Sequence, residues 1–308
     1  MPYTNYQLKI PNLNTKFKLS GNYIISIFND NDEVVLKRRF IIYEPNVTVA
    51  VTAHKSRDIS NIDTHQTVQF TINNANFRIN NPSQEVMPVI LQNNNWQTAI
   101  TGLKPQFYRG NQLMYQYDKE TTFWAGNEFW KFDTKEIRSG NIDIANVELG
   151  TDTYNTYLYT VEERIGQPYT LFPDINGNFL IRTLTGELNN LEADYSWVHF
   201  SLESLEDLRG KDVFVSGNFN NWALNNSNKL KYNKGNGLYE VTILMKQGFY
   251  NYQFVTLDQK GNFSNHDIDG SHYQTENDYT VLVYFRPFGA RYTKVIGVGV
   301  ANSKILLN

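Results

Sequence analysis

The hydrophobic positions of the chain follow the alternation of β-strands and not the periodicity of helices. Short runs rich in Val, Ile, Tyr and Phe recur between clusters of Gly, Asn and Asp. This pattern is typical of β-sandwiches, because alternate side chains of a strand point to opposite faces of a sheet. No window carries a long apolar run at the i, i+3, i+4, i+7 spacing of an amphipathic helix. The pattern predicts an all-β protein with strands at residues 22–28, 34–43, 47–53, 67–72, 87–92, 96–101, 179–184, 195–202, 213–216, 237–244, 250–256 and 279–285.

Asn-rich turns separate several of these strands, as at residues 29–32 and 93–95. The pair Asn176-Gly177 is a strong signal for a two-residue hairpin, because both residues tolerate the positive φ that such a turn requires. The surrounding run DINGN begins like a calcium-binding loop, but Phe179 stands where that loop needs Gly. The sequence therefore predicts a hairpin here and no metal site.

We expect the 308 residues to form tandem immunoglobulin-like or early-set β-sandwich domains. Residues 1–46 supply only about two or three strands, and a lone hairpin is marginally stable in water. They are expected to be the C-terminal part of an immunoglobulin-like domain that is incomplete at its N-terminus. Residues 47–191 are predicted to form a central β-sandwich module, and residues 192–308 an early-set domain.

The amino-acid composition argues against nucleic-acid binding, cysteine chemistry and membrane-spanning segments. The net charge of −3 provides no basic surface for nucleic acid. There are no cysteines, so disulfides, thiolate nucleophiles and Cys-ligated metals are excluded. No apolar stretch approaches the ~18–20 residues that span a bilayer. The first residues lack the pattern of a secretory signal, so any such signal is expected to lie in a preceding N-terminal segment.

Candidate chemistry is sparse. Nucleophile-elbow, phosphate-loop and zinc-protease motifs are all missing. None of the five histidines, His54, His65, His199, His266 and His272, has a second histidine at metal-ligand spacing. We therefore predict no catalytic residue, no cofactor, no metal and no small-molecule substrate.

The run TTFWAGNEFWKFDTKEIR, residues 121–138, is the densest aromatic segment. In one interpretation Phe123, Phe129 and Phe132 anchor a core, while Asn127 and Glu128 hydrogen-bond a turn at the intervening glycine.

In the other interpretation the segment contacts a partner protein. Trp124 and Trp130 are then the strongest contact candidates, because amphipathic aromatics are enriched at interface hot spots.

Within this segment, FWAGNEFWKFD resembles the signature of the type IX secretion system plug protein family of Bacteroidota. Other runs resemble the same family in the same order along the chain: RRFIIYEP (38–45), the segment from INNP to NNNW (79–96), PDINGNFLIRT (173–183), EADYSWVHF (192–200), KQGFYNYQF (246–254) and YTVLVYFRPFGARYTKVIG (279–297).

The resemblance implies a non-enzymatic periplasmic protein, associated with the outer membrane, that binds the translocon barrel protein of this secretion system and seals its pore. The signature residues that it marks as candidate partner contacts are Trp124, Gly126, Asn127, Glu128, Phe129, Trp130 and Asp133.

The run VFVSGNFNNW, residues 213–222, resembles glycogen-binding early-set modules. In that family the Trp of the NNW turn, here Trp222, stacks on a glucose ring, and Phe263 stands where the family has its second stacking Trp. The alternative function is therefore glycan binding at a vestigial platform of Trp222 and Phe263. Phe214 and Phe219 are predicted core residues of the same hairpin.

Overall fold

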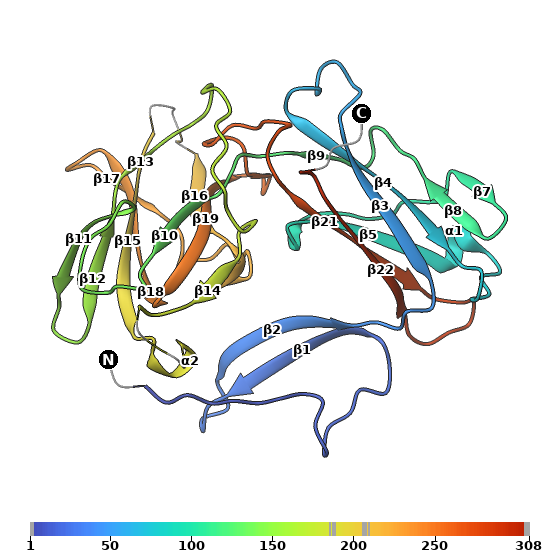
Figure 1. The fold of residues 1–308 in the computed structure, drawn as a ribbon, viewed down its shortest axis with the longest axis horizontal. Helices are drawn as coiled ribbons and strands as arrows, with labels where there is room; N and C mark the ends of the chain where they lie inside the picture. Colours follow the sequence, from blue (N-terminus) through green and yellow to red (C-terminus); the bar gives the residue numbers. More distant parts are fainter. Residues whose placement is uncertain (1–2, 185, 187–188, 205–207, 209, 305–308) are drawn as a thin grey trace. The chain divides into compact units, whose positions relative to one another are not determined.

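A computed structural model describes residues 3–184, 186, 189–204, 208 and 210–304 of the protein. Its elements are almost all strands (Figure 1), and the predicted all-β class is confirmed. The helical elements are single turns: α1 (Pro82–Glu85), α2 (Asn189–Glu192) and a 3-10 turn (Asn218–Asn220). The chain forms two compact units. Unit 1 consists of residues 124–275 and the N-terminus up to residue 6, and unit 2 consists of residues 7–123 and 276–308.

Unit 1 consists of two sheets. In the first, β19 (Gly248–Asp258) is the central strand. Its first half lies between the antiparallel strands β10 (Trp130–Asp133) and β14 (Phe179–Ile181). Its second half lies between the antiparallel strands β16 (Lys211–Ser216) and β20 (Phe263–Ser264).

The second sheet of unit 1 has the order β11-β12-β15-β18-β17, with β13 also on β15. Pairing is antiparallel except where β12 and β13 run parallel to β15. The strands are β11 (Ile144–Leu149), β12 (Tyr154–Leu158), β13 (Val161–Glu162), β15 (Tyr195–Glu203), β17 (Lys231–Asn233) and β18 (Leu238–Lys246).

The hydrophobic core of unit 1 contains side chains of both sheets. Phe132 of β10 is fully buried, stacks on Tyr250 of β19 at 5.2 Å and meets Phe200 of β15 edge to face at 5.7 Å. Val198, Leu202 and Met245 complete it from β15 and β18. Aromatic pairs in such geometries stabilise a core beyond the area that they bury.

Unit 2 also contains two main sheets. One has the order β22-β21-β5-β6, and the other β3-β4-β8-β7 with β9 on β4. The strands are β3 (Thr48–Lys55), β4 (His65–Asn73), β5 (Val86–Gln92), β6 (Asn95–Ile100), β7 (Phe107–Arg109), β8 (Gln112–Tyr115), β9 (Thr122–Trp124), β21 (Asp278–Phe285) and β22 (Lys294–Asn302).

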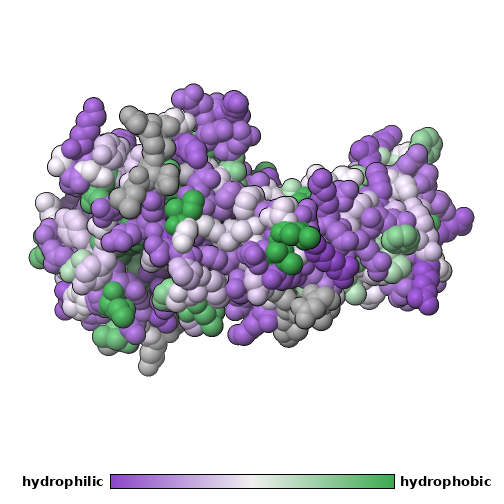
Figure 2. Space-filling view, turned by 90° about the horizontal axis from the view of Figure 1, so that it is seen from above, coloured by the Kyte–Doolittle hydropathy of each residue, from purple (hydrophilic) through white to green (hydrophobic). Residues whose placement is uncertain are grey.

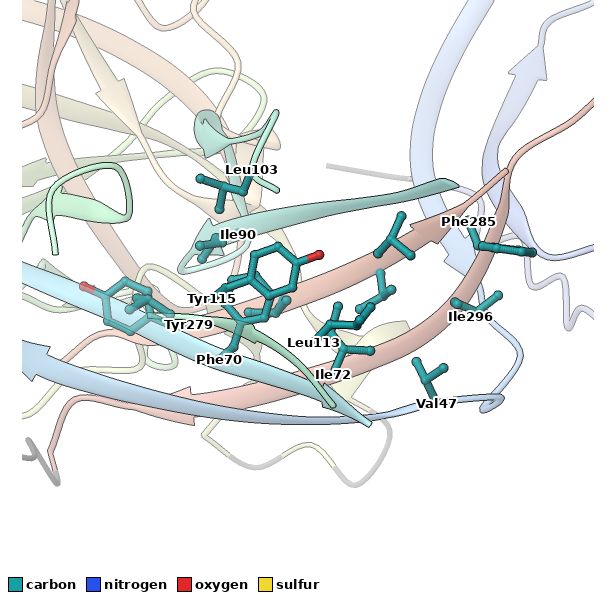
Figure 3. Close-up of a cluster of buried hydrophobic side chains, with 14 of the residues drawn as sticks. Val47, Phe70, Ile72, Ile90, Leu103, Leu113, Tyr115, Tyr279, Phe285 and Ile296 are labelled. Atoms are coloured by element: carbon teal, nitrogen blue, oxygen red, sulfur yellow. The ribbon is translucent and has the colours of Figure 1, made fainter. Parts of the chain in front are cut away.

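Figure 3 shows the core of unit 2, which contains side chains from segments far apart in the sequence. Phe70 of β4 stacks on Tyr115 of β8 at 4.3 Å. Tyr279 of β21 is fully buried, and its hydroxyl donates to Gln66 Oε1 at 2.6 Å. Ile296 of β22 lies in the same cluster.

A two-stranded hairpin, β1 (Gly21–Phe28) and β2 (Val34–Ile42), completes unit 2. The Tyr284 hydroxyl of β21 donates to Asn22 Oδ1 at 2.6 Å. The Arg39 guanidinium lies 4.9 Å from the ring of Trp96 in β6. These contacts attach the hairpin to the sheet of β5, β6, β21 and β22.

Each predicted strand corresponds to an observed one, and the turns at residues 29–32 and 93–95 join β1 to β2 and β5 to β6. The compact units differ from the predicted division at 46/47 and 191/192. The strands β21 and β22 lie in the last predicted domain, but β21 pairs with β5 of the middle one, and both strands belong to unit 2. Within unit 1, β12 pairs with β15 across the 191/192 boundary. Pairing between strands that are distant in sequence leaves no local signal.

The face in Figure 2 is mainly hydrophilic, with hydrophobic residues in small separate patches. Within the described part of the chain, no helix has the length and apolar character needed to cross a bilayer.

Candidate functional site: the signature segment 123–133

The signature segment runs from β9 to β10. Phe123 is buried in the core of unit 2, and Phe132 is in that of unit 1. Phe129 is also buried. The core interpretation of these three residues is confirmed.

Hydrogen bonds with residues 271–275 hold the turn at Gly126. Gly126 has a φ of +69°, which favours glycine. Its N–H donates to Ser271 Oγ at 2.9 Å. Its carbonyl accepts from the Thr275 hydroxyl at 2.8 Å and from the His272 N–H at 2.9 Å. The turn is therefore fully hydrogen-bonded within unit 1.

Asn127 and Glu128 are also used internally. Asn127 Nδ2 donates to the Asp269 carbonyl at 2.8 Å, and its Oδ1 accepts from the Glu128 N–H. The Glu128 side chain accepts from the Tyr169 hydroxyl at 2.5 Å. Glu128 is only 1% exposed, so its carboxylate does not face a partner in this conformation.

Asp269 and Arg164 bind the tryptophan of β10. Asp269 Oδ1 accepts from Arg164 Nε at 2.9 Å and from Trp130 Nε1 at 3.0 Å. The Arg164 guanidinium lies 4.1 Å from the Trp130 ring, and its Nη2 donates to the Glu128 carbonyl at 2.8 Å. A buried ion pair with additional hydrogen bonds and a cation–π contact holds the signature strand in place.

The Asn176-Gly177 turn has φ values of +53° and +76°, as a primed turn requires. The hairpin prediction is nevertheless wrong. No described strand ends directly before the turn, and β14, which follows it, pairs with β19. The turn instead presents Asp174, whose carboxylate accepts from the Phe129 N–H at 2.6 Å and the Asn176 N–H at 2.7 Å.

The remaining signature residues differ in exposure. Asp133 accepts from Arg182 Nη2 at 2.5 Å. Trp130 is half-buried. Trp124 is 41% exposed and stacks on the His266 ring with a centroid distance of 3.7 Å. Of the candidate partner contacts, Trp124 is the one that presents a large aromatic surface.

The glycan platform of Trp222 is covered. Trp222 is only 4% exposed, and the centroid of its ring lies 5.9 Å from that of Phe129. A Cβ at Gly177 would collide with the end of its indole. Because these groups cover the ring, no sugar can stack on it in this conformation. Phe263 of β20 is half-buried.

Phe214 is buried, and Phe219 packs against the core of unit 1. The predicted core role of both residues is confirmed.

Burial shapes the protonation of the two imidazoles beside the signature segment. It lowers the pKa of His266, and burial with the nearby Arg164 charge lowers the pKa of His272. Both shifts favour the neutral imidazole. The described residues include no group of three or more His, Asp or Glu placed to hold a metal ion.

Sequence reasoning missed the partners of the signature segment, chiefly Arg164, Tyr169 and Asp269. They lie 36 to 142 positions from the groups that they bind, and no local pattern singles them out. Asp174 did carry a signal, because it falls in a run that resembles the same family as the signature.

Two of three comparisons with known proteins found a match. The model of the first domain of type 9 secretion system plug proteins matches residues 1–44. The crystal structure of a hypothetical protein from Parabacteroides merdae is similar, with 33% sequence identity and a TM-score of 0.91. That similarity covers 95% of this chain and 74% of the other. A comparison with curated proteins found no match. The match over residues 1–44 assigns this first-domain segment of the chain to the type 9 secretion system plug protein family, and the similarity to the Parabacteroides merdae protein extends over most of both chains.

Proposed function

We propose that the protein is a non-enzymatic periplasmic plug that binds the outer-membrane translocon barrel of the type 9 secretion system and seals its pore. The observation that carries the proposal is the family assignment of residues 1–44. The family is a structural component of secretion and not a known enzyme family.

The signature segment supports the proposal by its rigidity. A plug has to keep its shape against a barrel, and flexible loops would lose conformational entropy on binding. Here the polar groups of residues 126–130 bind Arg164, Asp174 and Asp269 within unit 1. Their role is to hold the body of the protein together.

Trp124 supports a role in contact. Its ring is exposed, yet stacking on His266 fixes its orientation before any partner arrives. An ordered, accessible Trp is the kind of residue that dominates interface energies. A stable seal also requires a buried area of at least ~1,000 Å², so Trp124 would be one contact among many.

Co-purification from membranes tests the binding. We expect the full-length protein to be recovered with the translocon barrel, and Trp124→Ala to reduce that recovery. Tyr159→Ala, an exposed aromatic of the same unit, is the matched control and should have no effect. Recovery of the protein only as a free species would contradict the proposal.

Permeability tests the seal. Deletion of the gene should sensitise cells to a large antibiotic that the outer membrane normally excludes. The sensitivity should disappear when the translocon barrel is deleted as well, because an unplugged pore is then no longer present. Unchanged permeability in the single deletion would rule out a sealing role.

A further inference from the structure

One edge of the second sheet of unit 1 is left open by a short strand. β17 has three residues and pairs only with Leu238–Glu240 of β18. β18 continues to Lys246 and pairs with β15 from Tyr239 to Lys246. Within the described chain, no strand pairs with residues 241–245 on the side away from β15. This stretch is the free edge of β18.

A groove of about 710 Å³ lies along the free edge. It is lined by residues 241–244, by Trp197 of β15 and by the segment from Asn226 into β17. Trp197 and Leu244 are directly paired across the two strands and are 39% and 37% exposed. Lys231 and Glu240, which lie opposite each other on β17 and β18, also line the groove, as does Lys229, which is paired with Asp212 at 2.7 Å. The edge is therefore bordered by an apolar pair and by the exposed cation of Lys231.

The free edge lacks the features that normally protect an edge strand. Its residues, Val-Thr-Ile-Leu-Met, include no charge and no proline and have high β-propensity. The flanking charges are engaged: Glu240 accepts from Asn233 at 3.0 Å and Asn236 at 2.7 Å, and Lys246 donates to the Asn190 carbonyl at 2.7 Å.

The opposite edge of the same sheet shows the usual protection. β11 pairs with β12 through a register shift between Ile144 and Asn146, and it carries the charged Glu148. Bulges and edge charges prevent pairing with another chain. One edge of this sheet is thus closed to pairing while the other is open and grooved.

We propose that the free edge of β18 binds an extended segment of a partner protein as an added strand, in line with β17. Main-chain hydrogen bonds to residues 241–245 would supply affinity, and alternate side chains would meet Trp197 and Leu244. The exposed Lys231 in the groove selects a segment with acidic side chains. This strand-binding activity is additional to the proposed plug role.

The register of β17 excludes a second copy paired about Ile243 as the occupant. Two β18 edges paired antiparallel about Ile243 would bring Lys246 of one copy opposite Glu240 of the other. Lys231 already occupies that position. The result would be a steric overlap and a contact between like charges, which a separate acidic segment avoids.

Peptide selection on the full-length protein tests the proposal. A display library of random peptides of about twelve residues, long enough for one strand, is panned on the protein. Selected peptides are synthesised, and their affinities are measured by fluorescence anisotropy. We expect alternating β-branched residues with acidic positions, and slower hydrogen exchange at residues 241–245 in the complex.

Matched variants locate the site. Leu244→Lys should weaken the selected peptides by about tenfold or more, since an edge Lys opposes strand addition. Leu149→Lys on β11, where Leu149 is 77% exposed, should change affinity by less than about twofold. Lys231→Glu, an exposed position that does not depend on apolar packing, should weaken acidic peptides specifically.

Several results would overturn the proposal. These are the absence of enriched peptides, equal binding by Leu244→Lys, protection that appears outside residues 241–245, and a concentration-dependent dimer that Leu244→Lys abolishes. The last result would identify a second copy as the occupant.

Discussion

At the residue scale, the signature segment is defined by its internal partners. Asp269 binds Arg164 and Trp130, Asp174 binds the backbone of Phe129, and Tyr169 binds Glu128. Glu128 and Asp269 are buried, where an unpaired polar group would cost about 1–3 kcal/mol, and Arg164, Tyr169 and Asp174 are half-buried. The segment is thus held by polar groups that hydrogen-bond one another, while among the described residues Asp269 Oδ2 is buried without a hydrogen-bond partner.

Gly177 should tolerate no side chain. A Cβ there would collide with Trp222 and lie 2.9 Å from Phe129 Cε1. We expect Gly177→Ala to lower the free energy of unfolding by about 2–4 kcal/mol, from overpacking plus backbone strain. Urea unfolding followed by Trp fluorescence measures the change.

Gly166→Ala is the control for backbone strain. Gly166 has the same φ of +76° but nothing within 4 Å of its Cβ position, so the cost should be about 1 kcal/mol. Equal destabilisation by the two variants would show that packing on Trp222 contributes nothing.

The Arg164–Asp269 pair should matter far more than an exposed pair. Its side chains are 14% and 3% exposed, and removing one charge leaves the other buried. We expect Asp269→Asn to cost about 3–5 kcal/mol of unfolding free energy. Asp212→Asn breaks the exposed 2.7 Å pair with Lys229 and should cost at most about 1 kcal/mol. Similar effects of the two substitutions in thermal or urea unfolding would contradict this assignment.

Stability should fall when the solution is acidified through the range where histidine titrates. Burial lowers the pKa of His266, with Asp267 opposing and Lys211 reinforcing the shift. The unfolded chain therefore binds a proton near about pH 6.5, where the folded chain does not yet bind one. Stability is complete above that pH and declines as the pH falls toward the folded pKa.

His266→Gln should reduce this decline without removing it, because burial also lowers the pKa of His199 and His272. Urea unfolding between about pH 7.5 and about pH 5.5 measures the slope. A slope identical to that of the parent protein would show that His266 does not contribute.

At the scale of elements, strong period-2 segments were predictable and short or glycine-rich strands were not. The strands between residues 107 and 162 have two to six residues, too few for alternation to stand out. β22 contains Gly297 and Gly299, which lower β-propensity. Both glycines are needed because a Cβ at Gly297 would collide with Val47, and a Cβ at Gly299 would collide with Val49 of β3.

The backbone conformation of the Asn-rich turns was predictable from the sequence, but the part that each turn plays in the fold was not. Asn93-Asn94 and Asn176-Gly177 both adopt positive φ. The first joins two paired strands, whereas the second positions Asp174 for Phe129. The same local conformation therefore served a hairpin in one place and a buried hydrogen-bond network in the other.

At the scale of the whole molecule, each compact unit has its own core. The core of unit 1 includes Phe132, Ile144, Leu158 and Val161 together with residues beyond 192. We expect a fragment of residues 124–275 to unfold cooperatively, because it contains this core entire.

A fragment of residues 192–308 is the comparison. It separates β15 from β12 and β21 from β5, so it exposes buried faces and should not fold cooperatively. Circular dichroism and thermal unfolding of both fragments distinguish the two divisions of the chain. Cooperative folding of 192–308 alone would favour the boundary predicted from the sequence.

The sequence by itself determined the β class, the longer strands, the buried aromatics of the signature and the family resemblance, since all of these depend on local pattern or motif. Only the tertiary structure decided that Trp222 is covered, that Arg164 and Asp269 hold the signature, and that residues 276–308 complete unit 2. The physical reason is that these features depend on contacts between residues far apart in the chain. The hydrophobic effect drives such contacts without directional preference, and strand register then fixes them.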